Sequence, residues 1–306
     1  MPASNERFIR KAADSAADAI FLDLEDAVAP EVKIDAREGA IAALNGIDWG
    51  RRQMAVRVNA LDTPWACRDI IELAARAPRL DLILLPKAGS AADVKFVERL
   101  IAGIENEAGR AAPLGIEVLI ETAAGVAHAE EIAAASPRLE AMIFGLGDYS
   151  IEMRTFDFNI GHPSRRYVVE GGAEPHYNDQ WHFALARIAN ACRANGLRPI
   201  DGPYADFGNP DGYRASAMRA AALGFEGKWA IHPSQIAIAN EIFTPSEQQV
   251  RWANDVVEAL TSSMRSGTGA IAIDGVLIDL AHLKMARSVL DRAGLIDRFE
   301  CEDGRT

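Results

Sequence analysis

Short apolar runs rich in β-branched residues alternate with longer Ala-rich segments along most of the chain. This alternation is typical of βα units, in which helices cover a sheet of parallel strands. The runs recur about every 25 to 35 residues, the length that a strand, a helix and two loops need. We predict seven strands, over residues 19–25, 54–60, 80–87, 114–121, 139–147, 198–204 and 227–232.

The intervals between these runs carry helical patterns with favourable end signals. Pro30 precedes the first of them, and Gly196 and Gly224 follow two others, as expected where helices begin and end. We predict helices over residues 31–44, 64–77, 91–108, 123–135, 181–195 and 211–223, and a further helix over residues 5–17 opens the chain.

A closed (β/α)8 barrel has eight strands, each followed by its helix. Here a helix comes first, so the chain begins about one strand too late for a closed barrel, and the missing strand would lie immediately before Pro2. The predicted fold class is therefore α/β, a TIM (β/α)8-type barrel that lacks its first strand and has an open seam.

One long segment, residues 150–180, interrupts the repeat. Loops of this length in a compact domain usually carry function or are disordered. The segment contains several residues suited to binding or to turns, namely His162, Arg165, Arg166, Gly171, Gly172 and His176.

The last part of the chain does not follow the βα repeat. Residues 246–264 and 282–298 have helical patterns and flank a predicted hairpin over residues 270–280, which turns at Asp274–Gly275. We therefore predict two domains, a catalytic β/α barrel over residues 1–245 and a C-terminal helix–hairpin–helix module over residues 246–306.

The composition fits a soluble enzyme with a sizeable core, since 49% of the 306 residues are hydrophobic and 25% are charged. A net charge of −12 argues against a nucleic-acid partner, although local Arg and Lys side chains can still bind an anionic substrate. No run of about 20 apolar residues could cross a membrane, and the N-terminus has no apolar signal-peptide core. The three cysteines are odd in number and lack metal-like spacing, so reduced thiols and a cytoplasmic location are expected.

Acidic residues stand where apolar strands end. Glu121 and Asp148 close consecutive predicted strands, so in a barrel they lie side by side at the rim where active sites are found. Two carboxylates this close repel each other unless a cation or a proton lies between them. We predict a Mg²⁺ site, and Mn²⁺ accepts the same oxygens. The alternative is that each acid caps the following helix or pairs with a basic neighbour.

Three basic residues also lie near strand ends. Arg57 could bind a substrate carboxylate or a developing oxyanion, or it could form a buried ion pair with Glu25 or Asp26, and Asp26 could instead cap a helix. Lys87 could form a Schiff base or an ion pair. His232 is expected to be structural more often than catalytic.

The strand-end motifs together resemble the malyl-CoA lyase and citrate lyase β-subunit superfamily, which is of the HpcH/HpaI aldolase type, and are most similar to its malyl-CoA/β-methylmalyl-CoA lyase branch. The resemblance covers almost the whole chain. It depends on LDLEDAVAPEVK (22–33), VRVNALDTPW (56–65), LPKAGSAADV (85–94), IETAAGVAHAEEIA (120–133), GLGDY (145–149), DGPYADF (201–207) and GKWAIHPSQIAIANEIFTPS (227–246).

The resemblance implies roles for individual residues. Glu121 and Asp148 match the metal ligands, and Arg57, supported by Glu25 and Asp26, matches the arginine that holds glyoxylate and its oxyanion.

Outside the strand ends, the resemblance implies that Asp279 completes a neighbouring subunit's site in a homo-oligomer, a trimer or a hexamer, with the C-terminal module as a lid. Lys11 matches a lysine that contacts coenzyme A, while Asn5 stands where related chains often have Arg.

The implied reaction is Mg²⁺-dependent cleavage of (S)-malyl-CoA to glyoxylate and acetyl-CoA, with β-methylmalyl-CoA, which would give propionyl-CoA, as a second candidate substrate. The sequence leaves four alternatives open. They are a malyl-CoA thioesterase, a citryl-CoA lyase, an aldolase of free keto acids, and a non-catalytic assembly or regulatory subunit.

Overall fold

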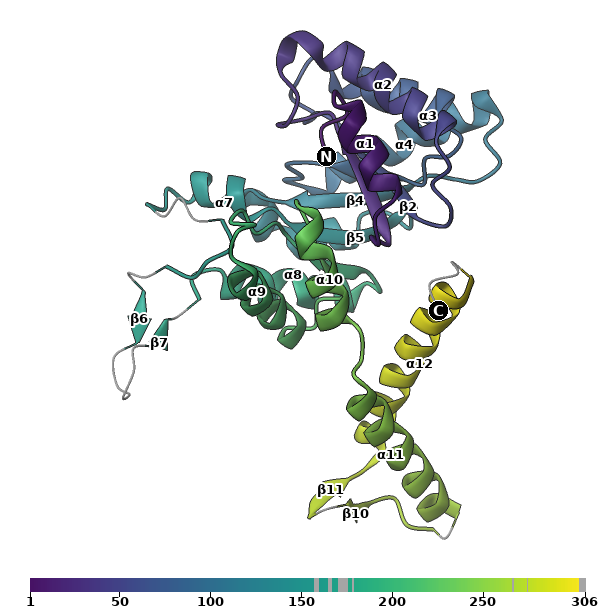
Figure 1. The fold of residues 1–306 in the computed structure, drawn as a ribbon, viewed down its shortest axis with the longest axis vertical. Helices are drawn as coiled ribbons and strands as arrows, with labels where there is room; N and C mark the ends of the chain where they lie inside the picture. Colours follow the sequence, from purple (N-terminus) through teal and green to yellow (C-terminus); the bar gives the residue numbers. More distant parts are fainter. Residues whose placement is uncertain are drawn as a thin grey trace. The chain divides into compact units, whose positions relative to one another are not determined.

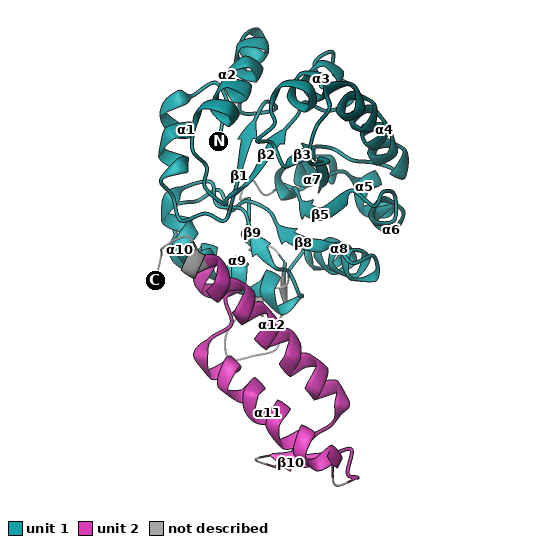
Figure 2. Cartoon of the chain, turned by 90° about the vertical axis from the view of Figure 1, so that its right-hand side faces the viewer, with its two compact units in different colours: residues 1–239 teal, residues 240–306 magenta. Residues whose placement is uncertain are grey.

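A computed structural model describes residues 1–156, 160–164, 167–169, 176–177, 179–265, 267–273 and 275–302. The chain divides into two compact units, residues 1–239 and 240–306, which are coloured separately in Figure 2. Arg165, Arg166, Gly171, Gly172 and Asp274, which the sequence analysis singled out, lie outside the described residues.

The first unit is built on a sheet of parallel strands, and all seven predicted strands are confirmed. The strands are shorter than predicted because their last residues belong to the loops that carry the polar side chains. The predicted strand 227–232 is the extreme case, since it is reduced to two residues. The sheet order is β1 (Ala19–Asp23), β2 (Gln53–Arg57), β3 (Leu82–Leu85), β4 (Gly115–Ile120), β5 (Leu139–Phe144), β8 (Arg198–Asp201) and β9 (Gly227–Lys228).

Helices follow the strands and lie around their outer side, as Figure 2 shows. The predicted helix over residues 123–135 is in fact two short helices, because the backbone leaves the helical conformation at His128. The helices that begin in this unit are α1 (Glu6–Ala13), the 3-10 helix η1 (Pro30–Val32), α2 (Lys33–Gly46), α3 (Ala66–Arg76), α4 (Ala91–Ala108), α5 (Ala123–Ala127), α6 (Ala129–Ala133), α7 (Leu146–Glu152), α8 (His182–Ala194), α9 (Pro210–Ala222) and α10 (Pro233–Phe243), whose last residues belong to the second unit.

Helix α4 illustrates how the local sequence sets these elements. Ser90 and Asp93 form a capping box at its start, and Gly109 ends it in the left-handed conformation with φ 64°. Val94 and Val97, which share one face of the helix, are fully buried.

Side chains from every second residue of the strands fill the space on the inner face of the sheet. Leu84, Leu119 and Ile143 form a buried cluster against Phe21, Ile200 and Trp229. The rings of Phe21 and Trp229 lie 4.4 Å apart, although β1 and β9 stand at opposite ends of the sheet order. The sheet therefore curls into a partial barrel, and side-chain packing connects its two edges.

The free edge of β1 is partly covered by the N-terminal residues. The Asp23 N–H donates to the Met1 carbonyl (2.8 Å), the Ala3 N–H donates to the Asp23 carbonyl (2.9 Å), and Pro2 forms a parallel bridge with Asp23. This one bridge stands where a first strand would lie, so the prediction of an incomplete TIM-type barrel is confirmed.

The insert contains a short antiparallel pair, β6 (Val168–Val169) and β7 (His176–Tyr177), labelled in Figure 1.

None of the helices that the structure describes is long and apolar enough to span a membrane.

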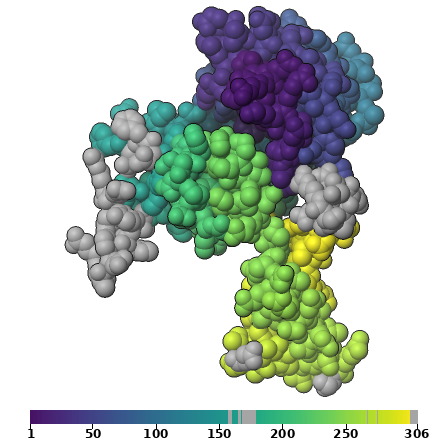
Figure 3. All heavy atoms as spheres, viewed as in Figure 1, coloured from purple at the N-terminus to yellow at the C-terminus, as the bar shows by residue number. Residues whose placement is uncertain are grey.

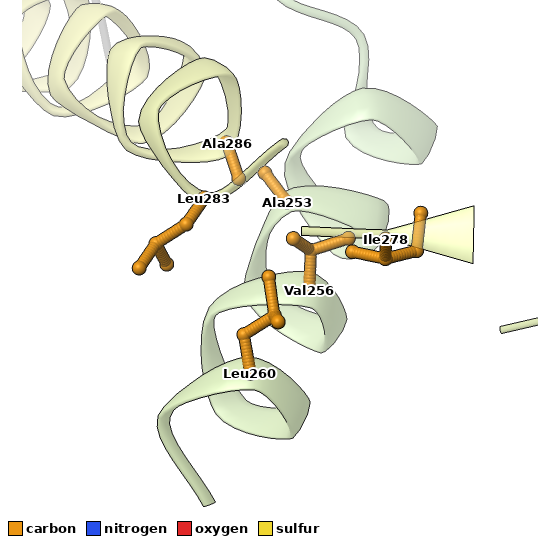
Figure 4. Close-up of a cluster of buried hydrophobic side chains, with 6 residues drawn as sticks. All are labelled: Ala253, Val256, Leu260, Ile278, Leu283 and Ala286. Carbon is orange, nitrogen blue, oxygen red and sulfur yellow. The ribbon is translucent and has the colours of Figure 1, made fainter. Parts of the chain in front are cut away.

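The second unit is the predicted helix–hairpin–helix. It consists of α11 (Glu247–Arg265), β10 (Ile271–Ile273), β11 (Val276–Ile278) and α12 (Leu280–Glu302). It has a small core of its own, shown in Figure 4, which joins both helices to the hairpin. The buried members are Ala253, Val256, Leu260, Ile278, Leu283 and Ala286.

Candidate active site

The carboxyl ends of the first five strands carry a cluster of charged side chains. Parallel strands bring their carboxyl ends to the same rim, so residues far apart in sequence meet there. We call this group the acid cluster. Its members are Asp23, Glu25, Asp26, Arg57, Lys87, Glu121 and Asp148.

Arg57 is held at the rim by a bidentate ion pair. Its Nε and Nη2 atoms each lie 2.7 Å from an oxygen of Asp23, the residue opposite it in the register of β1 and β2. Its Nη1 lies 3.1 Å from Glu25 Oε2 and 3.9 Å from Asp26 Oδ2, so both predicted partners are also near. The guanidinium is therefore rigidly oriented, with Nη1 left on the side away from Asp23.

The pKa values of this pair follow from burial and charge. Burial alone would lower the pKa of Arg57, but the hydrogen bond and the charge of Asp23 raise it above its usual range. Burial would raise the pKa of Asp23, but Arg57 outweighs it and holds that pKa below its usual range. Both groups therefore stay ionised. The sequence analysis did not identify Asp23. Residues two apart in a strand face the same side of the sheet, so an inward-facing Phe21 would have placed Asp23 on the inner side as well.

Lys87 joins several acids of the cluster. Its Nζ lies 2.5 Å from Glu25 Oε1, 3.7 Å from Asp26 Oδ1 and 3.9 Å from Asp148 Oδ2. Its main-chain N–H donates to Glu121 Oε1 at 2.9 Å. Of the two predicted alternatives for Lys87, the ion pair is therefore present. Because one residue contacts both Glu121 and Asp148, the two predicted metal ligands share one site.

Glu121 is buried in this site, with 3% of its surface exposed. Burial, together with the negative charges of Glu25 and Asp148, raises its pKa to about 8. Gly145 packs directly against it, and a Cβ atom there would collide with Glu121 Oε2. Neither predicted ligand is the N-cap of the next helix, since Thr122 precedes α5 and Gly145 precedes α7.

The acid cluster is short of positive charge. It holds five carboxylates and two cations, and the Lys33 ammonium lies close to three of these acids. The buried Oε2 of Glu25 makes no hydrogen bond, although it lies 3.1 Å from Arg57 Nη1. A hard divalent cation fits this oxygen-rich set. Among the described residues, no group of three or more His, Cys, Asp or Glu side chains is placed to hold a metal.

Buried polar residues outside the cluster fix the loops that carry it, and sequence reasoning missed them. The Lys33 ammonium donates to the carbonyls of Leu24 (2.8 Å) and Glu25 (2.9 Å), directly beneath the first acidic loop. Asp69, fully buried, accepts from the side chain of Asn59 (2.6 Å) in the loop after Arg57. The rim is therefore anchored from below by two charged side chains.

Two predicted assignments differ in the structure. Asp26 does not cap a helix, because η1 has Ala29 at its N-cap. His232 does not end a strand; it lies in the loop before α10, bonds Ser234 Oγ at 2.8 Å and stacks on Phe207.

Lys11 lies in α1, whose outer surface is visible in Figure 3, and Asn5 is the N-cap of this helix. Lys11 is exposed and makes none of the contacts of the acid cluster. The side chain of Asn5 caps the helix by accepting from the Phe8 N–H at 3.1 Å. Asn5 therefore has a structural role at the start of this helix.

Asp279 belongs to the second unit, at the junction of β11 and α12. Its Oδ1 accepts from the Ala281 N–H (2.9 Å) and lies 2.9 Å from His282 Nδ1, and half of its side chain is exposed. The hydrogen bond from His282, followed by those of the backbone, lowers its pKa.

Known proteins match nearly the whole chain. An L-malyl-CoA/beta-methylmalyl-CoA lyase of Cereibacter sphaeroides is 47% identical over 96% of this chain and 93% of its own length, and a (3S)-malyl-CoA thioesterase of the same species is 38% identical over 98% and 94%. The crystal structure of CitE from Mycobacterium tuberculosis in complex with magnesium, acetoacetate and coenzyme A superposes with a TM-score of 0.74 at 32% identity, covering 96% of both chains. The sequence profile of the HpcH/HpaI aldolase/citrate lyase family matches residues 1–233, and this chain belongs to that family.

Proposed function

We propose that this chain is a Mg²⁺-dependent carbon–carbon lyase that cleaves (S)-malyl-CoA to glyoxylate and acetyl-CoA, and β-methylmalyl-CoA to glyoxylate and propionyl-CoA. The observation that carries the proposal is the acid cluster, in which Glu121 and Asp148 share one site beside a rigid Arg57. The similarity to lyases named for these substrates, at 45–47% identity over nearly the full length, supports the substrate class.

In the proposed mechanism Glu121 and Asp148 hold Mg²⁺, which when bound supplies a Lewis acid for the oxygen that becomes the aldehyde of glyoxylate. Arg57 donates to the same part of the substrate, and its pairing with Asp23 fixes the direction of the guanidinium in advance. A positioned donor of this kind is worth about 3 kcal/mol in the transition state. Glu25 and Asp26 lie beside the Nη1 atom of Arg57 and help to orient it.

Proton exchange at the carbon next to the thioester is assigned to Asp279 of a neighbouring subunit. Its lowered pKa keeps the carboxylate ionised at neutral pH, the form that accepts a proton from acetyl-CoA in the condensation direction. In cleavage the substrate hydroxyl loses its proton to solvent as it becomes the aldehyde, and the C–C electron pair passes to the thioester enolate. Asp279, which takes up a proton from solvent, then delivers it to the enolate carbon.

This assignment makes residues 246–306 a lid in a homo-oligomer, which we propose to be a trimer or a hexamer. Val276 and Leu277, next to Asp279 on the hairpin, are 56% and 67% exposed, which suits an apolar subunit contact. Lys11 is proposed to contact the phosphates of coenzyme A. Mn²⁺ is proposed as an alternative metal, and the cytoplasm as the location.

A second candidate, hydrolysis of the malyl-CoA thioester, is favoured by the similarity to a (3S)-malyl-CoA thioesterase. Incubating the full chain with malyl-CoA, with and without Mg²⁺, separates the two. The lyase releases glyoxylate and acetyl-CoA in equal amounts and no free thiol, whereas a thioesterase releases malate and free coenzyme A. Glu121→Gln is the matched control and should release neither the products of cleavage nor those of hydrolysis.

The same experiment tests the remaining alternatives. A citryl-CoA lyase would release oxaloacetate from citryl-CoA in preference to cleaving malyl-CoA, and an aldolase of free keto acids would turn over substrates without coenzyme A. A non-catalytic subunit would show no turnover at any Mg²⁺ concentration. Any of these results, or lyase activity that is independent of a divalent metal, would contradict the proposal.

A further inference from the structure

Lys87 has a backbone conformation that residues with a Cβ atom rarely adopt. Its φ angle is 53°, and among the described residues only Arg154 shares a positive φ without being glycine. Such strain persists where surrounding contacts enforce it, and it is concentrated at functional sites.

Three contacts enforce the conformation at Lys87. The Lys87 N–H donates to Glu121 Oε1 (2.9 Å), and the next N–H, of Ala88, donates to the Leu119 carbonyl (3.3 Å). Gly125 closes over the same loop, since a Cβ atom there would approach the Ala88 carbonyl oxygen to 2.5 Å. The loop after β3 is thus tied to both the end of β4 and the start of α5.

The strained backbone orients a carboxylate. With Glu121 Oε1 held by the Lys87 N–H and Gly145 against Oε2, the carboxylate has little freedom to rotate. The Lys87 side chain then returns to the same cluster and holds Glu25, whose other oxygen faces Arg57 Nη1 at 3.1 Å. Burial alone would lower the pKa of Lys87, but the hydrogen bond to Glu25 and the nearby acids raise it, so the ammonium stays charged.

We propose that Lys87 is a positioning residue with two separable functions. Its left-handed backbone fixes Glu121 for the metal, and its ammonium holds Glu25 against Arg57 while it serves as the resident counter-ion of the acid cluster. The inference rests on the proposed function for the roles of the metal and of Arg57.

The charge of Lys87 predicts effects of opposite sign on metal binding and on turnover. Removing the ammonium makes the cluster more negative by one charge, so Mg²⁺ should bind more tightly. Turnover should fall, because Glu25 no longer holds its place beside Arg57. A lysine that only stabilised the fold would weaken both.

The test compares Lys87→Met with Lys95→Met, which removes an exposed lysine from α4, in the full-length protein. In Lys87→Met the Mg²⁺ dissociation constant, measured by calorimetry at pH 9 without substrate, should fall about 3- to 10-fold. The kcat for malyl-CoA should fall about 10- to 100-fold with a smaller change in KM. Lys87→Arg should recover part of the kcat, and Lys95→Met should change neither quantity.

The backbone function is tested by Lys87→Gly against Lys87→Ala, since both lose the amine and only glycine adopts this φ freely. Lys87→Gly should melt a few degrees higher than Lys87→Ala. Weaker Mg²⁺ binding or an unchanged kcat in Lys87→Met, or equal melting of the Gly and Ala variants, would overturn the proposal. The binding and melting experiments need no substrate, so they still decide the matter if the proposed lyase activity itself is wrong.

Discussion

Magnesium affinity should depend steeply on pH, because the proton that occupies Glu121 competes with the metal. Burial and the charges of Glu25 and Asp148 raise the Glu121 pKa from 4.5 to about 8 in the metal-free protein. Since the carboxylate must be ionised to bind a metal, each pH unit below this pKa weakens binding about tenfold. The ionised fraction is about one half at pH 8 and about 1% at pH 6, so Mg²⁺ should bind about 50-fold more weakly at pH 6.

The same pKa sets the sign of the stability change. Between pH 4.5 and about 8 the folded metal-free protein keeps the Glu121 proton that the unfolded chain has lost, so the free energy of unfolding falls as pH rises through this window. The increase in melting temperature on adding Mg²⁺ should therefore be larger at pH 8 than at pH 6.

Calorimetric titration at pH 6, 7 and 8, in buffers of different ionisation enthalpy, measures both the affinity and the protons released. We expect about one proton released per Mg²⁺ at pH 6 in the unaltered protein. Glu121→Gln, which has no such proton, should bind weakly with little dependence on pH. An affinity that stays constant from pH 6 to pH 8, with no proton release, would refute this account of Glu121.

Three further predictions concern single substitutions. Arg57→Lys keeps the charge but loses the bidentate pairing with Asp23. The kcat for malyl-CoA should therefore fall about 10²- to 10³-fold, with Mg²⁺ affinity nearly unchanged. Full activity would show that the two parallel hydrogen bonds of the guanidinium are unnecessary. Gly145→Ala should displace Glu121 and weaken Mg²⁺ binding at least tenfold by calorimetry, because the new methyl group collides with its carboxylate; normal binding would mean that Glu121 Oε2 is not a ligand. Asp279→Asn should abolish cleavage of malyl-CoA without changing Mg²⁺ affinity, and retained turnover would remove Asp279 from the proton transfer.

Much of the architecture could be predicted because it depends on local patterns. Apolar runs at a regular spacing gave the seven strands, and the acids at the ends of two neighbouring runs indicated that Glu121 and Asp148 meet at one rim. Strand ends were overestimated because the polar residues beyond Leu85 and Ile120 have loop backbones.

The support of the site was harder to predict because it depends on tertiary packing. Asp23 becomes the main partner of Arg57 only once the register of two strands is known. Nothing in the sequence around Lys87 marks a left-handed backbone, since lysine has no preference for it and the contacts that enforce it come from other strands. Lys33 likewise reaches carbonyls nine and eight residues away only because of the path of the intervening loop.

The central claim is that Glu121 and Asp148 bind one divalent cation at the carboxyl ends of the barrel strands. Anomalous diffraction from crystals of the full chain grown with Mn²⁺ tests it most directly. The account predicts one strong peak within about 2.0–2.3 Å of an oxygen from each carboxylate, with the other positions open to water or substrate. A well-occupied peak on other ligands, or none at this rim at saturating Mn²⁺, would contradict it.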